Sequence, residues 1–199
     1  MEKIVEYFYT PISPFVYLGA ARFRAICAEH GATIHHKPIE MARVFPAAGA
    51  LPLAQRPQQR QAYRLVELKR WSDFLGLPMV LEPTHFPVPA TNAACLILAA
   101  RDAGYDPLPL TEAIGEAVWL NDRDVSDPAT LIELADNLGL PGRQLITDAA
   151  SNTVVDTYMR YTDEAISLGI FGAPTYCYRG EMFWGQDRLD FLSRALSEK

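Results

Sequence analysis

Ser13 occupies a position at which a side chain could bind an anion. It follows Lys3–Tyr9, a segment rich in β-branched and aromatic residues, and it precedes Pro14, a residue favoured at the first position of a helix. Helix N-termini carry unpaired amides and about half a positive charge, so a hydroxyl group there can help to hold an anion. An ordinary helix cap is the alternative, because serine is a preferred capping residue and no activating base lies nearby in sequence.

Three arginines form a second candidate feature. Arg56, Arg60 and Arg64 are spaced by four residues, so a helix that begins near Pro57 would place them in one basic stripe. The chain as a whole is acidic, with 24 Asp and Glu against 18 Lys and Arg, a net charge of -6 and a pI near 5.2. The stripe would be either a solvated helix face or a positive rim that attracts a carboxylate. The acidic balance predicts no nucleic-acid partner.

Other chemistries lack a supporting pattern. The chain has three cysteines, an odd number, and they lie far apart in the sequence: Cys27, Cys95 and Cys177. We therefore expect neither a disulfide framework nor a metal site, and we expect a cytoplasmic location. His35 and His36 are neighbours in a predicted strand, where alternation would send their rings to opposite faces. The chain begins with acidic residues, and its longest apolar run is far shorter than a membrane span. We therefore expect no membrane association.

The pattern of elements predicts a single domain of class α/β. The 199 residues are 49% hydrophobic, and no linker or repeat divides them, so we expect one unit over 1–199. Strands are predicted at 3–9, 32–39, 174–178 and 181–184, the last two joined at Arg179-Gly180. Helices are predicted at 15–30, 57–74, 91–103, 110–120, 128–138, 142–168 and 188–196.

This order of elements is typical of a thioredoxin-like fold. A βαβ half and a ββα half enclose a large all-helical insertion, as in DsbA-like proteins. We expect the thioredoxin-like part at about 1–50 and 170–199, and the helical insertion at about 51–169.

Three segments resemble the signatures of 2-hydroxychromene-2-carboxylate isomerases, which belong to the DsbA-like and kappa-class glutathione transferase group. They are residues 9–17 (YTPISPFVY), 171–175 (FGAPT) and 184–189 (WGQDRL), and the likeness extends over nearly the whole chain. The resemblance implies a cytoplasmic, usually dimeric, glutathione-dependent enzyme with serine in place of the first DsbA cysteine. A dithiol oxidoreductase is excluded, because neither active-site cysteine is present.

By position, the resemblance implies a glutathione site. Ser13 would hydrogen-bond the glutathione sulfur, and Ala173, before a cis Pro174, would pair through its backbone with the cysteinyl part. The γ-glutamyl end would be held by Trp184, Gly185, Gln186 and Asp187. The Asp187 carboxylate suits an ammonium group, and a helix cap ahead of Arg188 is its alternative role.

The substrate side of the resemblance departs from the family. Phe45 stands where the family's enzyme of known chemistry has a lysine. Gln55 and Arg56 correspond to an asparagine-arginine pair, and His85 corresponds roughly to a tyrosine. The resemblance therefore implies a substrate site formed by these four residues.

We therefore expect a glutathione-dependent cis–trans isomerase that acts on an unsaturated aromatic oxo-acid in aromatic hydrocarbon degradation. Glutathione is the expected cofactor, and the expected partners are the small aromatic substrate and a second copy of the chain. A kappa-like glutathione transferase acting on a hydrophobic electrophile is one alternative, since Phe45 would weaken selection for a carboxylate. A non-catalytic DsbA-like protein that binds a peptide is another.

Overall fold

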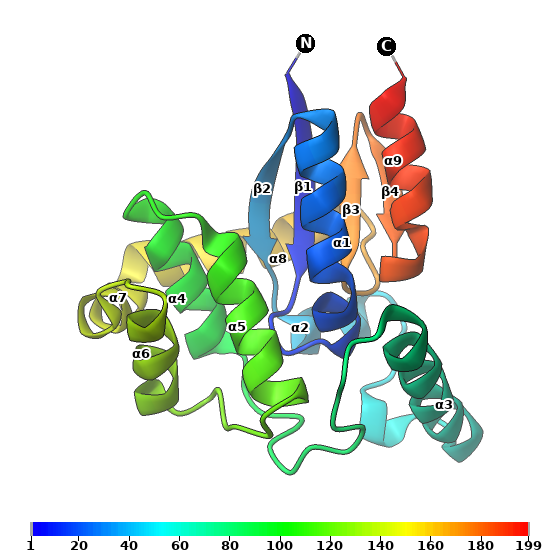
Figure 1. Cartoon of the computed structure of the whole chain (residues 1–199), viewed down its shortest axis with the longest axis horizontal. Helices are drawn as coiled ribbons and strands as arrows, with labels where there is room; N and C mark the ends of the chain where they lie inside the picture. Colours follow the sequence, from blue (N-terminus) through cyan, green and yellow to red (C-terminus); the bar gives the residue numbers. More distant parts are fainter. Residues whose placement is uncertain (1, 199) are drawn as a thin grey trace.

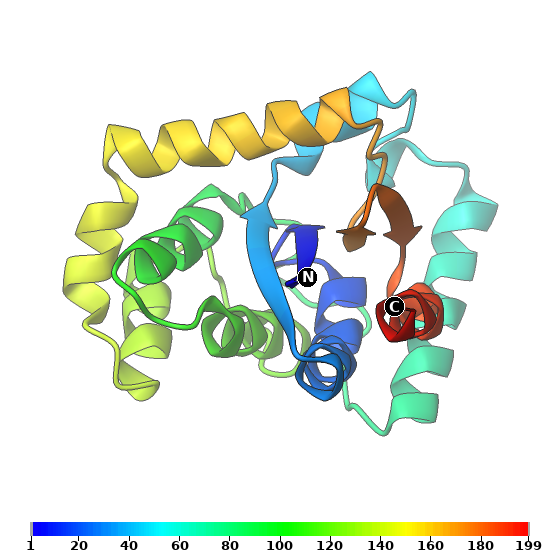
Figure 2. The same cartoon turned by 90° about the horizontal axis from the view of Figure 1, so that it is seen from above.

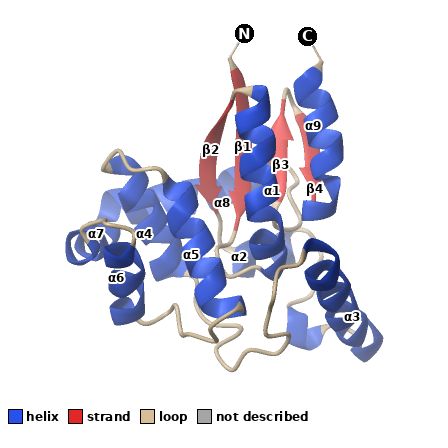
Figure 3. Ribbon diagram, in the orientation of Figure 1, coloured by secondary structure: helices blue, strands red, loops and turns tan. Residues whose placement is uncertain are grey.

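The centre of the molecule is a four-stranded sheet (Figures 1 and 3) in a computed structural model that describes residues 2–198. Its strands are β1 (Lys3–Tyr9), β2 (Ala32–Pro38), β3 (Thr175–Tyr178) and β4 (Glu181–Trp184). They lie in the order β2-β1-β3-β4, with β1 and β2 parallel and the other two pairs antiparallel. This arrangement confirms the predicted thioredoxin-like fold.

Helices cover both faces of the sheet. On one face lie α1 (Pro14–His30) and α9 (Leu189–Ser197), which pack against each other. On the other face lie α2 (Met41–Ala47) and α8 (Asn152–Ser167), as the view from above shows (Figure 2). The sheet is therefore the middle layer of three.

The alternation of side chains along β1 explains these layers. Tyr7 and Tyr9 are fully buried in the main core, on the side of α1. Phe8, which points to the opposite side, is buried with Ala165 of α8 and Cys177 of β3. Every residue at this end of the strand is therefore covered by a helix, which is why its sequence is apolar throughout.

The insertion is entirely helical, as predicted. It contains α3 (Gln58–Leu75), α4 (Thr91–Asp102), α5 (Pro107–Trp119), α6 (Pro128–Asn137), α7 (Gly142–Ala149), α8 and one short 3-10 turn, η1 (Leu53–Gln55). A second 3-10 turn, η2 (Gln186–Arg188), follows β4 and lies outside the insertion. Asp106 and Asp127 begin α5 and α6, since each side chain accepts a hydrogen bond from a backbone amide two residues later.

Two details differ from the prediction. The single helix expected over 142–168 is two helices, α7 and α8, because the Ser151 hydroxyl accepts a hydrogen bond from Val154 N–H and starts a new helix. Helix α2 was not predicted, since it is short and contains Pro46. None of the helices within residues 2–198 is both long and apolar enough to cross a bilayer.

Candidate functional site

The ends of all four strands meet at one edge of the sheet. Phe8 of β1 pairs with Thr175 of β3, which in turn pairs with Trp184 of β4. The last residue of β2, Pro38, lies opposite Tyr9. The turn that carries Ser13, the segment before β3 and the segment after β4 therefore come together from distant parts of the sequence, at the lower ends of the strands in Figure 1.

Ser13 begins α1 without acting as a side-chain cap. Its main-chain oxygen accepts hydrogen bonds from Val16 and Tyr17 N–H, both at 3.1 Å, but its side chain makes no capping hydrogen bond. The hydroxyl group has no other hydrogen-bond partner among residues 2–198, although the residue is only 8% exposed. The cap interpretation is therefore wrong for the side chain, and the hydroxyl is free to donate to a ligand.

The first turn of α1 also leaves one amide without a partner. Ser13 N–H donates to Thr10 O at 3.0 Å, Pro14 has no N–H, and Val16 donates back to Ser13. The Phe15 N–H finds no acceptor within the described part of the chain. An unpaired hydroxyl and an unpaired amide thus lie at the positive end of the same helix, a combination that favours an anion.

The Ala173-Pro174 peptide bond is cis, as the resemblance implies. Pro174 O accepts a hydrogen bond from Gly185 N–H at 2.9 Å, which ties this segment to the loop after β4. Neither the N–H nor the C=O of Ala173 bonds to any residue that the structure describes. Because Ala173 is only half-buried, its peptide groups can pair with an extended ligand, as an added strand would.

Trp184 forms a wall beside Ala173. Its side chain is half exposed, and its ring meets that of Phe171 edge-on, with 4.6 Å between the centroids. A methyl group on Gly172 would overlap the indole Nε1, so the indole lies directly against this glycine. The absence of a side chain at Gly172 therefore allows the indole to lie in this position beside Ala173.

Asp187 is engaged by its neighbour. Its Oδ2 atom accepts a hydrogen bond from Arg188 Nη1 at 2.6 Å, and both side chains are roughly half exposed. Asp187 does not cap α9, because the residue that precedes this helix is Arg188. Such an exposed pair is weak, so an ammonium group of a ligand could compete for the carboxylate.

Gln186 lies inside the protein. It is 1% exposed, its Cβ packs 2.7 Å from where a methyl group on Gly19 would be, and its main-chain oxygen accepts a hydrogen bond from Arg22 at 2.5 Å. Direct contact of Gln186 with glutathione stays a prediction, and the Gln186 side chain is enclosed by the protein. Gln186 positions the loop of Gly185 and Asp187 against α1.

The residues expected on the substrate side are spread over two elements and a loop. Phe45 of α2 lies under the Arg56 guanidinium, with 5.3 Å from Cζ to the ring centroid, and Arg56 Nε donates to Leu51 O at 2.9 Å. Gln55 is exposed, and His85 donates its backbone N–H to Asp122 Oδ1 at 3.2 Å. Phe45 and Arg56 are therefore in contact. Among the described residues, no hydrogen bond, ion pair or ring interaction joins either of them to the Gln55 side chain or to His85.

The three arginines do not form one stripe. Arg56 precedes α3, which begins at Gln58, and Arg60 is exposed. Arg64 is half-buried, with its guanidinium over two rings, those of Phe86 at 5.4 Å and Trp119 at 5.8 Å. Sequence reasoning gave no role to these aromatic residues, because only the folded chain brings them together.

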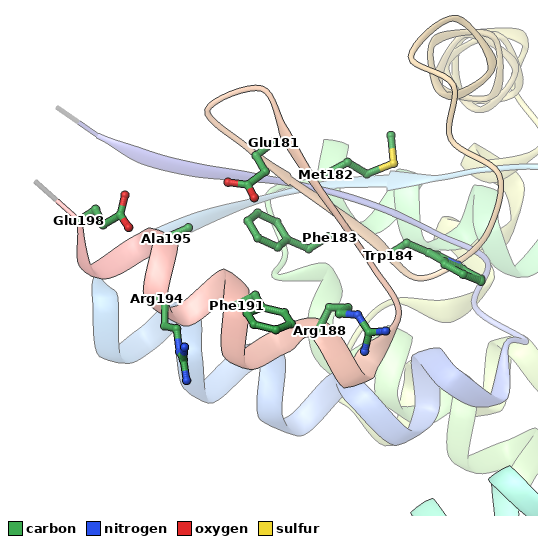
Figure 4. A pocket seen from close by; sticks show the side chains of 9 residues that line it. All are labelled: Glu181, Met182, Phe183, Trp184, Arg188, Phe191, Arg194, Ala195 and Glu198. Carbon is green, nitrogen blue, oxygen red and sulfur yellow. The ribbon is translucent and has the colours of Figure 1, made fainter.

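A groove between β4 and α9 is a separate feature (Figure 4). It has a volume of about 470 Å³, and Glu181 and Phe183 turn toward α9 there, while Met182 points to the other side of the strand. Neither Ser13 nor Ala173 lines it. We therefore place the candidate site at the strand ends.

The cysteines take no part in the site. Cys27, Cys95 and Cys177 are buried and unpaired, and burial raises their pKa values to about 12, 11 and 11. They therefore remain protonated thiols near neutral pH and are poor nucleophiles. Within residues 2–198, no group of three histidine, cysteine or acidic side chains is arranged to hold a metal ion.

Known proteins resemble this chain over nearly its full length. The 2-hydroxychromene-2-carboxylate isomerase of Pseudomonas putida is 29% identical over 196 residues, which are 97% of this chain and 94% of that protein. The enzyme of the same name from Sphingobium xenophagum is 27% identical, over 98% of this chain and 99% of the relative. A solved 2-hydroxychromene-2-carboxylate isomerase structure superposes with a TM-score of 0.80 at 26% identity, over 97% and 94% of the two chains.

These similarities confirm the resemblance to the isomerases that the three sequence segments indicated. The family model of the DSBA-like thioredoxin domain matches residues 4–197, almost everything from β1 to the end of α9. The chain therefore belongs to the family of DSBA-like thioredoxin-domain proteins.

Proposed function

We propose that the protein is a glutathione-dependent cis–trans isomerase of an unsaturated aromatic oxo-acid, of the 2-hydroxychromene-2-carboxylate isomerase type. One observation carries the proposal: the Ser13 hydroxyl and the Ala173 peptide groups, on neighbouring segments at one edge of the sheet, have no partner among residues 2–198. A ligand that is both peptide-like and able to become an anion would satisfy both. The names of the relatives support isomerisation as the reaction.

The chain's unpaired groups fit glutathione. Its cysteinyl part would pair with the Ala173 backbone, as a strand pairs with a sheet edge. Its γ-glutamyl part would lie along the exposed face of Trp184, where the only side chain among residues 2–198 that holds the Asp187 carboxylate is the exposed Arg188. Ser13 would then be the side chain that meets the sulfur.

Ser13 and the first turn of α1 would hold the sulfur as an anion. The Ser13 hydroxyl and the Phe15 N–H can each donate a hydrogen bond to negative charge, and the helix dipole adds to this effect. Hydrogen bonds to the charged form lower the pKa of a group, so these donors would favour the thiolate near neutral pH. Bound glutathione would supply a thiolate able to add reversibly to a conjugated carbon, so that the former double bond can rotate.

The transferase alternative rests on Phe45 and is weakened by its surroundings. The apolar ring was expected to reduce selection for a carboxylate. Arg56, however, lies over this ring at 5.3 Å, so positive charge is present at the same place. This contact favours an acidic substrate over a neutral electrophile.

Isothermal titration of glutathione into the wild-type protein and Ser13→Ala tests the proposal, with Ser197→Ala as the matched control. Ser197 lies exposed at the end of α9 and its hydroxyl donates to Ser193 O. We expect saturable binding by the wild type and the control, and about tenfold weaker binding by Ser13→Ala, the value of one hydrogen bond to a charged group.

Turnover of 2-hydroxychromene-2-carboxylate is then followed by absorbance, and free glutathione is measured before and after. An isomerase returns all of its glutathione, whereas a transferase consumes one molecule for each product. Absence of glutathione binding by the wild type would overturn the proposal in favour of a peptide-binding protein.

A further inference from the structure

We propose that Arg64 of α3 binds the carboxylate of the substrate and so selects an acid over neutral molecules of the same shape. The inference rests on the proposed function for the identity of the acid. Its evidence lies in a different part of the molecule from the Ser13 and Ala173 groups. The two ideas can therefore fail separately.

The Arg64 guanidinium lies over two aromatic rings but has no anionic or hydrogen-bonding partner among residues 2–198. It makes no hydrogen bond or ion pair with any residue in the described range, whereas Arg43, Arg101 and Arg123 each hold a carboxylate at 2.7 Å. Burial and the charge of Arg56 lower the pKa of Arg64 to about 10, so it stays charged at neutral pH. A half-buried guanidinium has lost part of its hydration, which costs free energy, and it has gained no ion pair in return. Binding of a carboxylate would offset this desolvation cost.

The surroundings of Arg64 fit an unsaturated ring compound. A hollow of about 240 Å³ beside it is lined by the apolar side chains of Leu53, Leu65, Leu81 and Phe86 and by the polar side chain of Gln61. Glu82 also lines the hollow but makes no ion pair with Arg64 within residues 2–198. A hollow that combines several apolar side chains with one cation that has no anionic partner is suited to an aromatic acid.

The Arg64 hollow is connected to the Ser13 turn by one side chain. The Trp119 ring lies under the Arg64 guanidinium at 5.8 Å, and its Nε1 donates to Ile12 O at 3.0 Å. Ile12 is the residue before Ser13. Trp119 is fully buried, so it supports both the Arg64 guanidinium and the Ser13 turn from inside the protein, and an acid in the hollow would reach Arg64 beside Phe86.

Arg56 is less suited to the same task. Its Nε already donates to Leu51 O, and its guanidinium lies over Phe45 in α2. Arg60, four residues before Arg64 on α3, is exposed and lies over no aromatic ring of residues 2–198. Arg64 is therefore the arginine of this group that is both unpartnered and enclosed.

The test uses chromone-2-carboxylate, a stable ring acid, and chromone-2-carboxamide, its neutral counterpart. Both are titrated into the full chain with and without saturating glutathione. The variants are Arg64→Met, Arg64→Lys and the matched control Arg60→Met. Thermal unfolding and glutathione binding of each variant show that it is folded.

We expect the wild type and Arg60→Met to prefer the acid over the amide. Arg64→Met should bind the acid about tenfold to a hundredfold more weakly and the amide almost unchanged, since one charge-assisted interaction is lost. Arg64→Lys should recover part of the affinity, because lysine keeps the charge but lacks the planar fork. With 2-hydroxychromene-2-carboxylate as the substrate of Arg64→Met, KM should rise by a larger factor than kcat falls.

Three results would overturn the inference. The first is an equal loss of acid and amide binding, which would make Arg64 a packing residue. The second is no preference of the wild type for the acid. The third is weaker binding of glutathione but not of γ-glutamylcysteine by Arg64→Met, which would assign Arg64 to the glycyl carboxylate. Acid selection by Arg64 in a protein that does not bind glutathione would instead uphold the inference and reject the proposed function.

Discussion

The indole Nε1 of Trp119 donates a hydrogen bond to the main-chain oxygen of Ile12 over 3.0 Å. Trp119 is the last residue of α5 and is fully buried, and Ile12 lies in the turn just before Ser13. A helix of the insertion thus fixes the turn that presents the Ser13 hydroxyl. The helical insertion therefore helps to hold the Ser13 turn in place.

Trp119→Phe should destabilise the protein and loosen this turn. Phenylalanine keeps most of the buried ring but leaves the Ile12 oxygen without its donor, which costs about 1–3 kcal/mol of unfolding free energy. Urea unfolding measures this loss, and glutathione titration should show weaker binding. Trp71→Phe is the control, because its indole makes no hydrogen bond among residues 2–198. Equal effects of the two variants would contradict the role given to the Trp119 hydrogen bond.

Gly172→Ala should displace Trp184. The added methyl group would overlap the indole Nε1, and the half-exposed ring can move away into solvent. We expect a change in tryptophan fluorescence and weaker glutathione binding, with a small loss of stability. Gly115→Ala is the control, because its methyl group would meet Tyr17 at an ordinary 3.4 Å. Unchanged glutathione affinity in Gly172→Ala would show that Trp184 is not a wall of the site.

Ser13→Ala should shift the pH profile of activity. The hydroxyl is a donor to the anionic sulfur in the proposed function, so its removal raises the pKa of the bound thiol. The rise of kcat/KM with pH, which follows formation of the thiolate, should therefore move to higher pH. Ser13→Thr keeps a hydroxyl and should restore part of the wild-type profile. A profile of Ser13→Ala that coincides with the wild type would remove Ser13 from the sulfur.

The elements of the fold were predictable because they follow local rules. Hydrophobic runs and turn residues identified the four strands, and the two-residue turn Arg179-Gly180 has the positive φ values of 51° and 81° that such hairpins need. The break at Ser151 was missed, since the apolar pattern continues across it and the hydroxyl that starts α8 is a single hydrogen bond. A break between two helices cannot be detected from the spacing of apolar residues when that spacing continues across the break.

The site residues could be predicted only where their place in the order of strands and helices determines their function. Ser13 and Ala173 lie where the order of elements places them, at the helix start and before β3. The burial of Gln186 against Gly19, and the place of Arg64 over Trp119, depend on contacts between residues far apart in the chain. No spacing in the sequence indicates such contacts.

His36 makes the stability of the fold depend on pH. The residue is 4% exposed, and its Nδ1 is hydrogen-bonded to the Tyr9 hydroxyl at 3.1 Å. Burial lowers the pKa of His36 to about 4, with smaller effects of Asp106, which raises it, and of Arg101 and His35, which lower it. The folded protein therefore keeps this imidazole neutral over most of the acidic range.

The sign of the effect follows from proton binding. In the unfolded chain the imidazole titrates near pH 6.5, so between about pH 6.5 and 4 the unfolded chain binds a proton that the folded protein excludes. The contribution of neutral His36 is fully present above pH 6.5 and is lost as the pH falls toward 4. The total loss is about 3 kcal/mol, at about 1.4 kcal/mol for each pH unit.

His36→Asn removes the titrating group, and His35→Asn, at the exposed neighbouring position of β2, is the matched control. Urea unfolding at several values between pH 7 and 4.5 should show a smaller decrease in stability for His36→Asn than for the wild type. The control should follow the wild type, because His35 is exposed on β2. If all three proteins lost stability in parallel over this range, the acid sensitivity would come from other groups and His36 would be protonated without cost to the fold.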